Sequence, residues 1–171
     1  MEIRPEVPDD RGLVALLYRQ AFVGNYEVEL IESLREAGVV PIALVAIDPD
    51  DELVGHILFA SVRVEVDGRP VPALVLAEMA VHDEHQNDGF GSRLVLRGLD
   101  AARALGIEAV LVLGHPTYYP RFGFSAERAR HLRTPFRGGD AFMALELVPH
   151  ALEGIAGHVT YPDAFELGPT R

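Results

Sequence analysis

One stretch decides the fold, because it leads from an apolar strand across a polar turn into a glycine-rich helix start: Glu78-Met79-Ala80-Val81-His82-Asp83-Glu84-His85-Gln86-Asn87-Asp88-Gly89-Phe90-Gly91-Ser92. The strand that leads into it, Val71 to Val81, is almost wholly apolar apart from Glu78. The helix that follows has apolar residues at helical spacing and a glycine just past its end: Leu94, Val95, Leu99, Ala102, Leu105 and then Gly106. The stretch predicts a buried strand that turns sharply into an amphipathic helix.

The sequence on either side of this stretch predicts the rest of a sheet. Leu53 to Val66 is typical of a long strand, and Asp67-Gly68 after it predicts a tight hairpin. Val39 to Ile47 and Phe142 to Leu147 are further strand candidates. Ala109 to Leu113 is a short buried strand of the kind found in parallel pairs.

Two helices are predicted before the sheet. In the first, Asp9 or Asp10 caps a helix whose apolar positions at helical spacing are Leu13, Leu16, Leu17 and Ala21. The second begins at about Tyr26 and stops at Gly38, with one face formed by Val28, Ile31 and Leu34. Helices, an antiparallel meander, a crossover helix and a parallel strand predict an α/β fold. We expect a single domain over residues 1–171, with a mixed central sheet of about six to seven strands flanked by helices.

Composition and charge exclude several classes of function. The 171 residues include no Cys and no Lys, since all 15 basic residues are Arg, which excludes thiol nucleophiles, Schiff bases and Walker-type phosphate loops. The net charge is −11, and by region it is −8 for residues 1–70, +1 for 71–139 and −4 for 140–171. Nucleic acid is therefore not an expected partner.

Membrane insertion and secretion are not expected either. No apolar run approaches the roughly 20 residues that a bilayer-spanning helix needs. The start of the chain, Met1-Glu2-Ile3-Arg4-Pro5-Glu6, lacks the basic and apolar regions of a secretory signal. We expect a cytoplasmic protein with no membrane partner.

The glycine-rich turn is a candidate phosphate site. A turn between a buried strand and a helix presents backbone N–H groups at the positive end of the helix dipole. Gly89 and Gly91 would let a ligand approach the backbone, and Arg93 or Arg97 would add charge. Alternatively, the two glycines only end the strand and begin the helix. A Rossmann dinucleotide site is disfavoured, because Leu94 stands where its third glycine would be.

Two motifs together resemble the GNAT superfamily of acetyl-CoA-dependent N-acetyltransferases. Glu78 to Val81 followed by Gln86-Asn87-Asp88-Gly89-Phe90-Gly91 is similar to its strand and Gln/Arg-x-x-Gly-x-Gly/Ala signature. About 30 residues on, Tyr119-Pro120-Arg121-Phe122-Gly123-Phe124 resembles its Tyr-x-x-x-Gly-Phe segment. The wider runs 112–119 and 141–147 resemble a bacterial branch of predicted acetyltransferases. The resemblance covers residues 1–150, and 151–171 form an extension without an interpretable motif.

The resemblance implies where acetyl-CoA, the expected cosubstrate, would bind. Its pantetheine arm would pair with the strand at Met79, Ala80 and Val81, and an N–H group of Met79 or Val81 would bond the thioester oxygen. Its pyrophosphate would lie on the turn and the first helical turn, with the side chain of Gln86 as an extra contact. The implied cofactor-binding residues of that turn are Gln86, Asn87, Asp88, Gly89, Phe90, Gly91 and Ser92.

The resemblance implies one catalytic residue, and the apolar strand itself suggests a second. Tyr119 matches the tyrosine that lies near the thioester sulfur and protonates the departing thiolate, although it could instead be a core aromatic; its neighbour Tyr118 is taken as structural. Glu78, the one acid in an apolar strand, is our candidate general base, because burial would raise its pKa. Pairing of Glu78 with an arginine is the alternative, and His115 and His56 are weaker candidates for the base. Other superfamily members place a strand glutamate at the position of Val75.

The cofactor and partner predictions follow from this interpretation. His82 and His85 lie in a turn without a third ligand, so no metal is predicted. The acceptor is a small-molecule or peptide amine, selected by the first two helices and the loop at residues 20–30, with candidates Phe22, Tyr26, Glu27 and Glu29. A homodimer through a sheet edge is left open. The alternative functions are a non-catalytic acetyl-CoA or CoA sensor and a protein-interaction domain without CoA binding.

Overall fold

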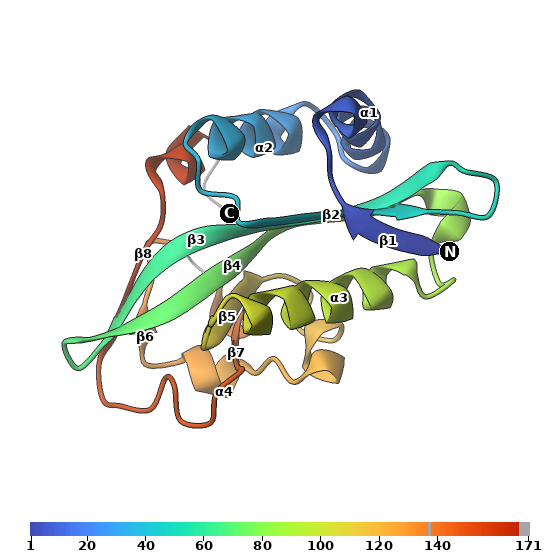
Figure 1. Cartoon of the computed structure of the whole chain (residues 1–171). Helices are drawn as coiled ribbons and strands as arrows, with labels where there is room; N and C mark the ends of the chain where they lie inside the picture. The colour runs from blue at the N-terminus through green and yellow to red at the C-terminus, as the bar shows by residue number, and fades with distance from the viewer. Residues whose placement is uncertain (137, 168–171) are drawn as a thin grey trace.

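The computed structural model describes residues 1–136 and 138–167, which form an open mixed sheet flanked by helices (Figure 1). The strands are β1 (Glu2–Pro5), β2 (Ile42–Ile47), β3 (Leu53–Val66), β4 (Arg69–Val81), β5 (Ala109–Leu113), β6 (Leu132–Arg133), β7 (Phe142–Glu146) and β8 (Gly157–Thr160). The helices are α1 (Arg11–Ala21), α2 (Tyr26–Glu36), α3 (Phe90–Ala104) and α4 (Ala126–Ala129). The predicted α/β class is confirmed. No helix in these residues is both long and apolar enough to cross a bilayer.

The sheet has eight strands instead of the expected six to seven. Six run in the order β1-β2-β3-β4-β5-β7, while β8 pairs with β3 and with β6. Within the described part of the chain, the β4–β5 and β6–β8 pairs are parallel and the other pairs are antiparallel. The sequence analysis missed β1, β6 and β8, because strands of two to four residues are too short to show periodicity. The extension after residue 150 thus contributes a strand to the sheet.

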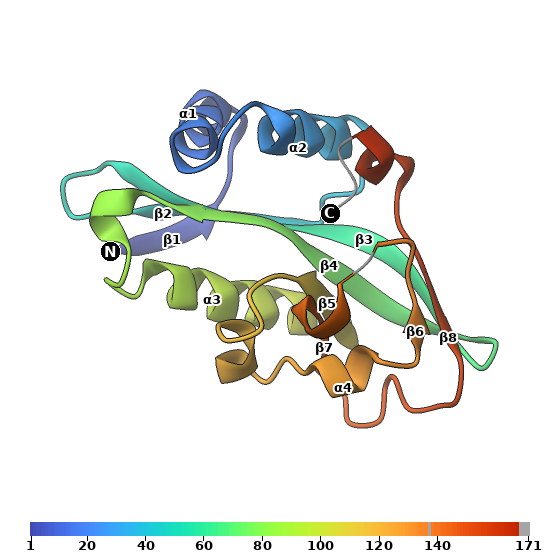
Figure 2. The same cartoon turned by 180° about the vertical axis from the view of Figure 1, so that it is seen from behind.

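The two faces of the sheet are covered by different helices. In Figure 1, α1 and α2 lie above the sheet and α3 below it, and Figure 2 shows the same layers from behind; the short α4 packs against β7. Each face has its own buried apolar cluster. Along β3, Leu58 and Ala60 belong to the cluster under α1 and α2, whereas Ile57 and Phe59 belong to the cluster over α3.

The predicted helices form, but the first one packs by a different face. Val14, Leu17 and Tyr18 are buried, whereas Leu13 and Leu16 are about half exposed, which corrects the predicted face. The buried face of α1 is rotated by about one residue from the predicted face. This rotation directs Tyr18 toward the sheet. Asp10, one of the two predicted capping residues, is the N-cap of this helix. Its carboxylate does not bond to the helix and instead accepts bonds from Arg4 and from the N–H of Val7.

The central hairpin forms as predicted. Asp67 and Gly68 join β3 to β4 with φ of 50° and 80°, a left-handed pair that matches the twist of the strands. Leu58 pairs with Glu78 and Phe59 with Leu76, so Ala77 is an extra residue, a β-bulge in β4. Because side chains alternate along a strand, this residue turns Glu78 to the face under α1 and α2.

Candidate active site

A cleft of about 750 Å³ lies where β4 and β5 diverge. The parallel pairing of β4 with β5 ends at Leu76 and Val112, and β5 itself ends at Leu113. Beyond that point β4 continues to Val81 along one wall of the cleft. The lining comes from β4, the turn before α3, the end of β5 and the segment after β5, and includes Glu78, Met79, Ala80, Val81, Gln86, Asn87, Gly89, Gly91, Ser92, His115, Tyr118, Tyr119 and Arg121. Both motifs of the sequence analysis therefore meet in one cleft.

The open edge of β4 is the first element of the site. On one side, residues 78–81 pair with residues 55–58 of β3. On the other side, within the described residues, the β4–β5 ladder does not reach them. This backbone edge is available to an extended ligand that adds to the sheet as a strand does.

The start of α3 is the second element. Gly89 is its N-cap with φ of 85°, a backbone conformation that glycine adopts without strain. The first helical bond runs from the N–H of Arg93 to the oxygen of Gly89, 3.1 Å away. The N–H groups of Phe90, Gly91 and Ser92 precede that bond and face out of the positive end of the helix. This end of α3 suits an anion.

The predicted turn residues contribute to the cleft in different ways. Asn87, with φ of 69°, lies beside Gly89 in the lining. The Gln86 amide donates to Asp83 at 3.2 Å and to the backbone oxygen of Val81 at 3.5 Å, so in this structure it braces the turn. Phe90 is a core residue of the cluster over α3.

The positive charge near the cleft comes from Arg121, which lies within the second motif but was not predicted as a site residue. Arg121 lines the cleft, donates to the backbone oxygen of Tyr118 at 3.0 Å and lies 4.5 Å from the centre of that residue's ring. Arg93 and Arg97, the cations expected there, are exposed on α3. Arg121 was detectable in principle, because it lies within the Tyr-x-x-x-Gly-Phe segment.

Tyr119 is held rigidly in the wall of the cleft. Its residue is only 8% exposed, and its ring packs edge-on against Phe124 with centroids 5.7 Å apart. A Cβ atom added to Gly114 would lie 2.4 Å from this ring, so the glycine makes room for it. Burial, and then the nearby Tyr118 and Glu78, raise the pKa of Tyr119 above its ordinary value. The phenol is therefore a protonated hydrogen-bond donor at neutral pH.

Glu78 lies on the opposite side of β4 from α3. It is 5% exposed, lines the cleft and faces α1 and α2 through the bulge at Ala77. Its carboxylate lies close enough to raise the pKa of both Tyr18 and Tyr119, in each case in addition to the effect of burial. Glu78 and Tyr119, the two predicted catalytic residues, therefore share the cleft, in which their chemistry is complementary.

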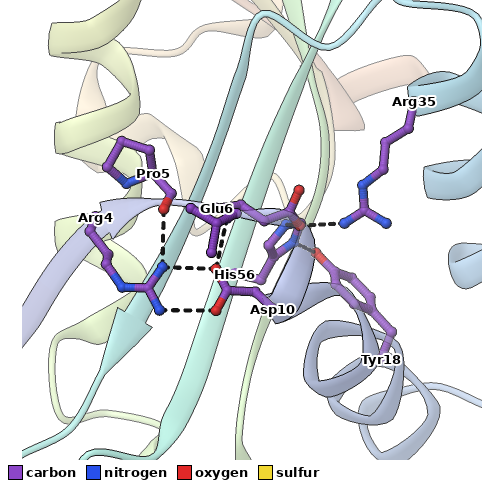
Figure 3. A network of polar contacts seen from close by, with 8 residues as sticks. Arg4, Pro5, Glu6, Asp10, Tyr18, Arg35 and His56 are labelled. Carbon is purple, nitrogen blue, oxygen red and sulfur yellow. Dashed lines mark hydrogen bonds and ion pairs between the residues drawn. The ribbon is translucent and has the colours of Figure 1, made fainter.

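A buried polar network joins Tyr18, His56, Glu6 and Arg35 (Figure 3), and Tyr18 lies close enough to Glu78 to feel its charge. The Tyr18 hydroxyl is 2.8 Å from His56 Nδ1, and His56 Nε2 is 3.0 Å from Glu6 Oε1, which also accepts from Arg35. Burial lowers the pKa of His56, while the bonds from His56 and Arg35 outweigh burial and lower the pKa of Glu6. His56 is therefore neutral, donating from Nε2 to an ionised Glu6 and accepting at Nδ1 from Tyr18.

His56 and His115, the weaker candidates for the general base, lie in different environments. Both ring nitrogens of His56 are occupied, and the residue is fully buried, so it does not reach a ligand in the cleft. His115 is exposed in the cleft lining. His85 also lines the cleft, with its ring 3.4 Å from Asp48 and 3.6 Å from Asp88. Among the described residues, no three His, Asp or Glu side chains form a group that could hold a metal ion.

Comparisons with known proteins agree with the two motifs. Residues 2–126 match the model of the acetyltransferase (GNAT) domain family. The chain is 34% identical over 166 residues to the uncharacterized N-acetyltransferase YhbS of Escherichia coli strain K12, covering 96% of this chain and 98% of that protein. A crystal structure of E. coli YhbS in complex with CoA has a TM-score of 0.88 at 33% identity, over 99% of this chain and 95% of that one. A GNAT family acetyltransferase from Brucella melitensis in complex with acetyl-CoA has a TM-score of 0.73 at 30% identity, over 96% and 97%.

Proposed function

This chain belongs to the GNAT acetyltransferase family, and we propose that it transfers the acetyl group of acetyl-CoA to a primary amine by direct attack. The observation that carries the proposal is the cleft, which combines an open strand edge, a helix N-terminus, a buried carboxylate and a buried phenol. The CoA held by YhbS and the acetyl-CoA held by the Brucella melitensis protein support acetyl-CoA as the donor.

Acetyl-CoA, the donor, would bind through its pantetheine arm and its pyrophosphate. The pantetheine arm pairs with the edge of β4 at Met79, Ala80 and Val81. The pyrophosphate accepts bonds from N–H groups between Asn87 and Ser92, which places its charge at the positive end of α3. Arg121 contributes a nearby positive charge. The thioester then lies between Glu78 and Tyr119, the residues that line the cleft below this edge.

The chemistry assigns one proton to each catalytic residue. The acceptor must lose a proton to expose its lone pair, and Glu78 is the base that receives it. As the nitrogen bonds to the thioester carbon, negative charge grows on the carbonyl oxygen and is stabilised by an N–H of Met79 or Val81. The carbon–sulfur bond then breaks, and Tyr119 donates its proton to the thiolate. The nitrogen gives up its second proton to the Tyr119 phenolate, which restores the phenol, and Glu78 releases the first proton to solvent. The products are an amide and free CoA.

The same residues argue against a CoA sensor. Binding alone needs the strand edge and the helix N-terminus, but it does not require a phenol held by Gly114 and Phe124 beside a buried carboxylate. An enzyme releases free CoA thiol in proportion to the amine supplied, whereas a sensor binds without turnover. Measuring thiol release from acetyl-CoA with a panel of primary amines separates the two functions. Tight acetyl-CoA binding with no amine-dependent thiol release would overturn the proposal.

Replacing Glu78 by glutamine tests the assignment of the base. We expect Glu78→Gln to slow amine-dependent thiol release about 100-fold at pH 7, within the usual range for general base catalysis. The defect should shrink as the pH rises towards the pKa of the amine, because the acceptor then arrives already neutral. Glu65→Gln, which changes an exposed glutamate of the neighbouring strand, is the matched control and should keep full activity. A loss that is the same at every pH would assign Glu78 a structural role.

A further inference from the structure

A second, smaller hollow adjoins the cleft on the face covered by α1 and α2. Its volume is about 40 Å³, and Leu76, Ala77 and Leu113 line both spaces. Those three residues stand at the bulge of β4 and the end of β5, where the two strands separate. The hollow therefore begins at the place where the reacting ends of two substrates would meet.

The far wall of the hollow is aromatic and comes from segments that are distant in sequence. Phe136 follows β6, Tyr161 follows β8, and Phe165 lies in the short helix η5 (Asp163–Leu167). The ring of Tyr161 is 4.7 Å from that of Phe136 and 5.3 Å from that of Phe165, both in edge-on contact. Such edge-on pairs stabilise the wall beyond the burial of their surface. In Figures 1 and 2, η5 lies beside α2.

Among the residues that the structure describes, no charged side chain lines the hollow. The lining consists of Tyr26, Leu30, Val75 and the six residues already named, all of them aliphatic or aromatic. Its hydroxyl groups are the phenols of Tyr26 and Tyr161, which are uncharged at neutral pH, and burial raises the pKa of Tyr161 further. A charged or strongly polar group placed here would lose its water without gaining an equal partner, which is unfavourable. An alkyl group placed here would instead bury apolar surface.

We propose that this hollow is the acceptor subsite and that the acceptor is a primary amine carrying a short, uncharged apolar chain. The inference rests on the proposed acetyl transfer. The amine nitrogen lies at the bulge near Glu78, and its carbon chain extends between α2 and the aromatic wall. About 40 Å³ accommodates about three groups of the size of a water or a methylene, by the volume that one water requires. The extension after residue 150, which carries Tyr161 and Phe165, thereby selects the acceptor.

The decisive comparison uses two amines of equal length. n-Butylamine and 1,4-diaminobutane have the same four carbons, but the second carries a distal ammonium group. We expect kcat/KM to be at least tenfold higher for n-butylamine. Equal values, or a preference for the diamine, would overturn the subsite while leaving acetyl transfer intact. Acetylation of no amine at all would overturn acetyl transfer itself.

Enlarging the hollow should change chain-length preference. We expect Phe136→Ala and Phe165→Ala, from separate segments, each to raise the ratio of kcat/KM for n-octylamine to that for n-butylamine at least fivefold. Leu105→Ala also shortens an apolar side chain, but at an exposed position just past the end of α3 and outside the lining of both spaces, so this control should leave the ratio unchanged. Unchanged ratios in both alanine variants would overturn the assignment.

A binding measurement tests the subsite without turnover. With saturating CoA present, calorimetry should detect N-butylacetamide binding with a negative heat-capacity change, the sign of apolar burial. We expect N-acetyl-1,4-diaminobutane to bind at least tenfold more weakly. Equal affinity of the two amides would overturn the subsite even if the rate of acetyl transfer were limited elsewhere.

Discussion

Tyr118 and Tyr119 are adjacent in sequence but occupy different environments. Tyr119 is buried against Gly114 and Phe124, whereas Tyr118 is half-buried with its ring under Arg121. The rings are nearly perpendicular, with centroids 5.1 Å apart. Tyr119 therefore forms part of the wall of the cleft, while Tyr118 lies beside the start of α3.

This difference gives a matched pair of substitutions. We expect Tyr119→Phe to lower kcat about 100-fold or more, the usual contribution of a general acid, and to leave the affinity for acetyl-CoA nearly unchanged. The ring and its packing are kept, so the decrease in kcat measures the contribution of proton donation by the hydroxyl. Tyr118→Phe should have a much smaller effect on kcat. The measurement is kcat for both variants with acyl donors of differing thiol acidity, and a Tyr119→Phe defect that ignores the leaving group would mean that the residue only packs.

At the scale of elements, the site depends on the end of one helix. The Cβ of any residue replacing Gly91 would lie 3.0 Å from the Tyr118 hydroxyl and 3.7 Å from a methyl group of Val81. The N-terminus of α3, the strand edge and the segment after β5 therefore touch at this glycine. A side chain there would disturb all three.

We expect Gly91→Glu to weaken acetyl-CoA binding at least tenfold, or about 1.4 kcal/mol. The added carboxylate would stand at the end of α3 that we propose for the pyrophosphate, and it would repel that anion. Gly12→Glu is the matched control, because Gly12 lies in the first turn of α1 with no atom within 4 Å of its missing Cβ. Calorimetric titration with acetyl-CoA measures both. Equal affinity of Gly91→Glu and the parent would place the phosphate site elsewhere.

The elements also show what local sequence patterns reveal. The Asp67-Gly68 hairpin and helix α3 were predicted correctly, because a left-handed turn pair and a long amphipathic repeat are signals within a single window. The bulge at Ala77 was not predicted, since the run from Ala73 to Ala77 is apolar throughout and shows no alternation to interrupt. The direction in which Glu78 points therefore required the structure.

The candidate site was predictable only in part for the same reason. Tyr119 and the glycine turn belong to motifs, so their place in the cleft could be expected. The acceptor side could not be, because Phe136, Tyr161 and Phe165 come together only through the pairing of β6 with β8. Of the predicted acceptor residues, Phe22 lines the cleft and Tyr26 lines the hollow, while Glu27 is buried and Glu29 is exposed.

At the scale of the whole molecule, the network in Figure 3 joins α1, α2 and β3 to the segment after β1. It also makes stability depend on pH. The folded-state pKa of His56 lies below its ordinary value of 6.5, so the unfolded chain takes up a proton that the folded chain excludes as the pH falls. The pKa values of Glu6 and Asp10 are lowered too, so their stabilisation is present above their ordinary values and is lost as the pH falls through the folded ones.

We therefore expect the free energy of unfolding to fall as the pH is lowered from 7 to 5, and to fall further below pH 4.5. Each pH unit in which the unfolded chain binds one more proton removes about 1.4 kcal/mol. His56→Gln should flatten the upper part of this profile. His150→Gln is the matched control, because the side chain of His150 is 74% exposed, and it should leave the profile unchanged. Chemical denaturation across this pH range gives the values, and a flat profile in the parent would contradict the neutral, buried state of His56.

The pairing of β8 with β3 has a consequence for the order in which the protein assembles. It joins Val64 to Val159, about 95 residues away along the chain, whereas the hairpin of β3 and β4 closes within a few residues. Because contacts between distant residues form slowly, we expect the hairpin to form early and β8 to dock late. The cleft that we propose for the donor is built mainly from residues 76–121, whereas the aromatic wall forms only when β8 has docked. During folding, the proposed donor cleft would thus form before the proposed acceptor subsite. Mutations that loosen β8 would therefore lower selectivity for the acceptor before they abolish catalysis.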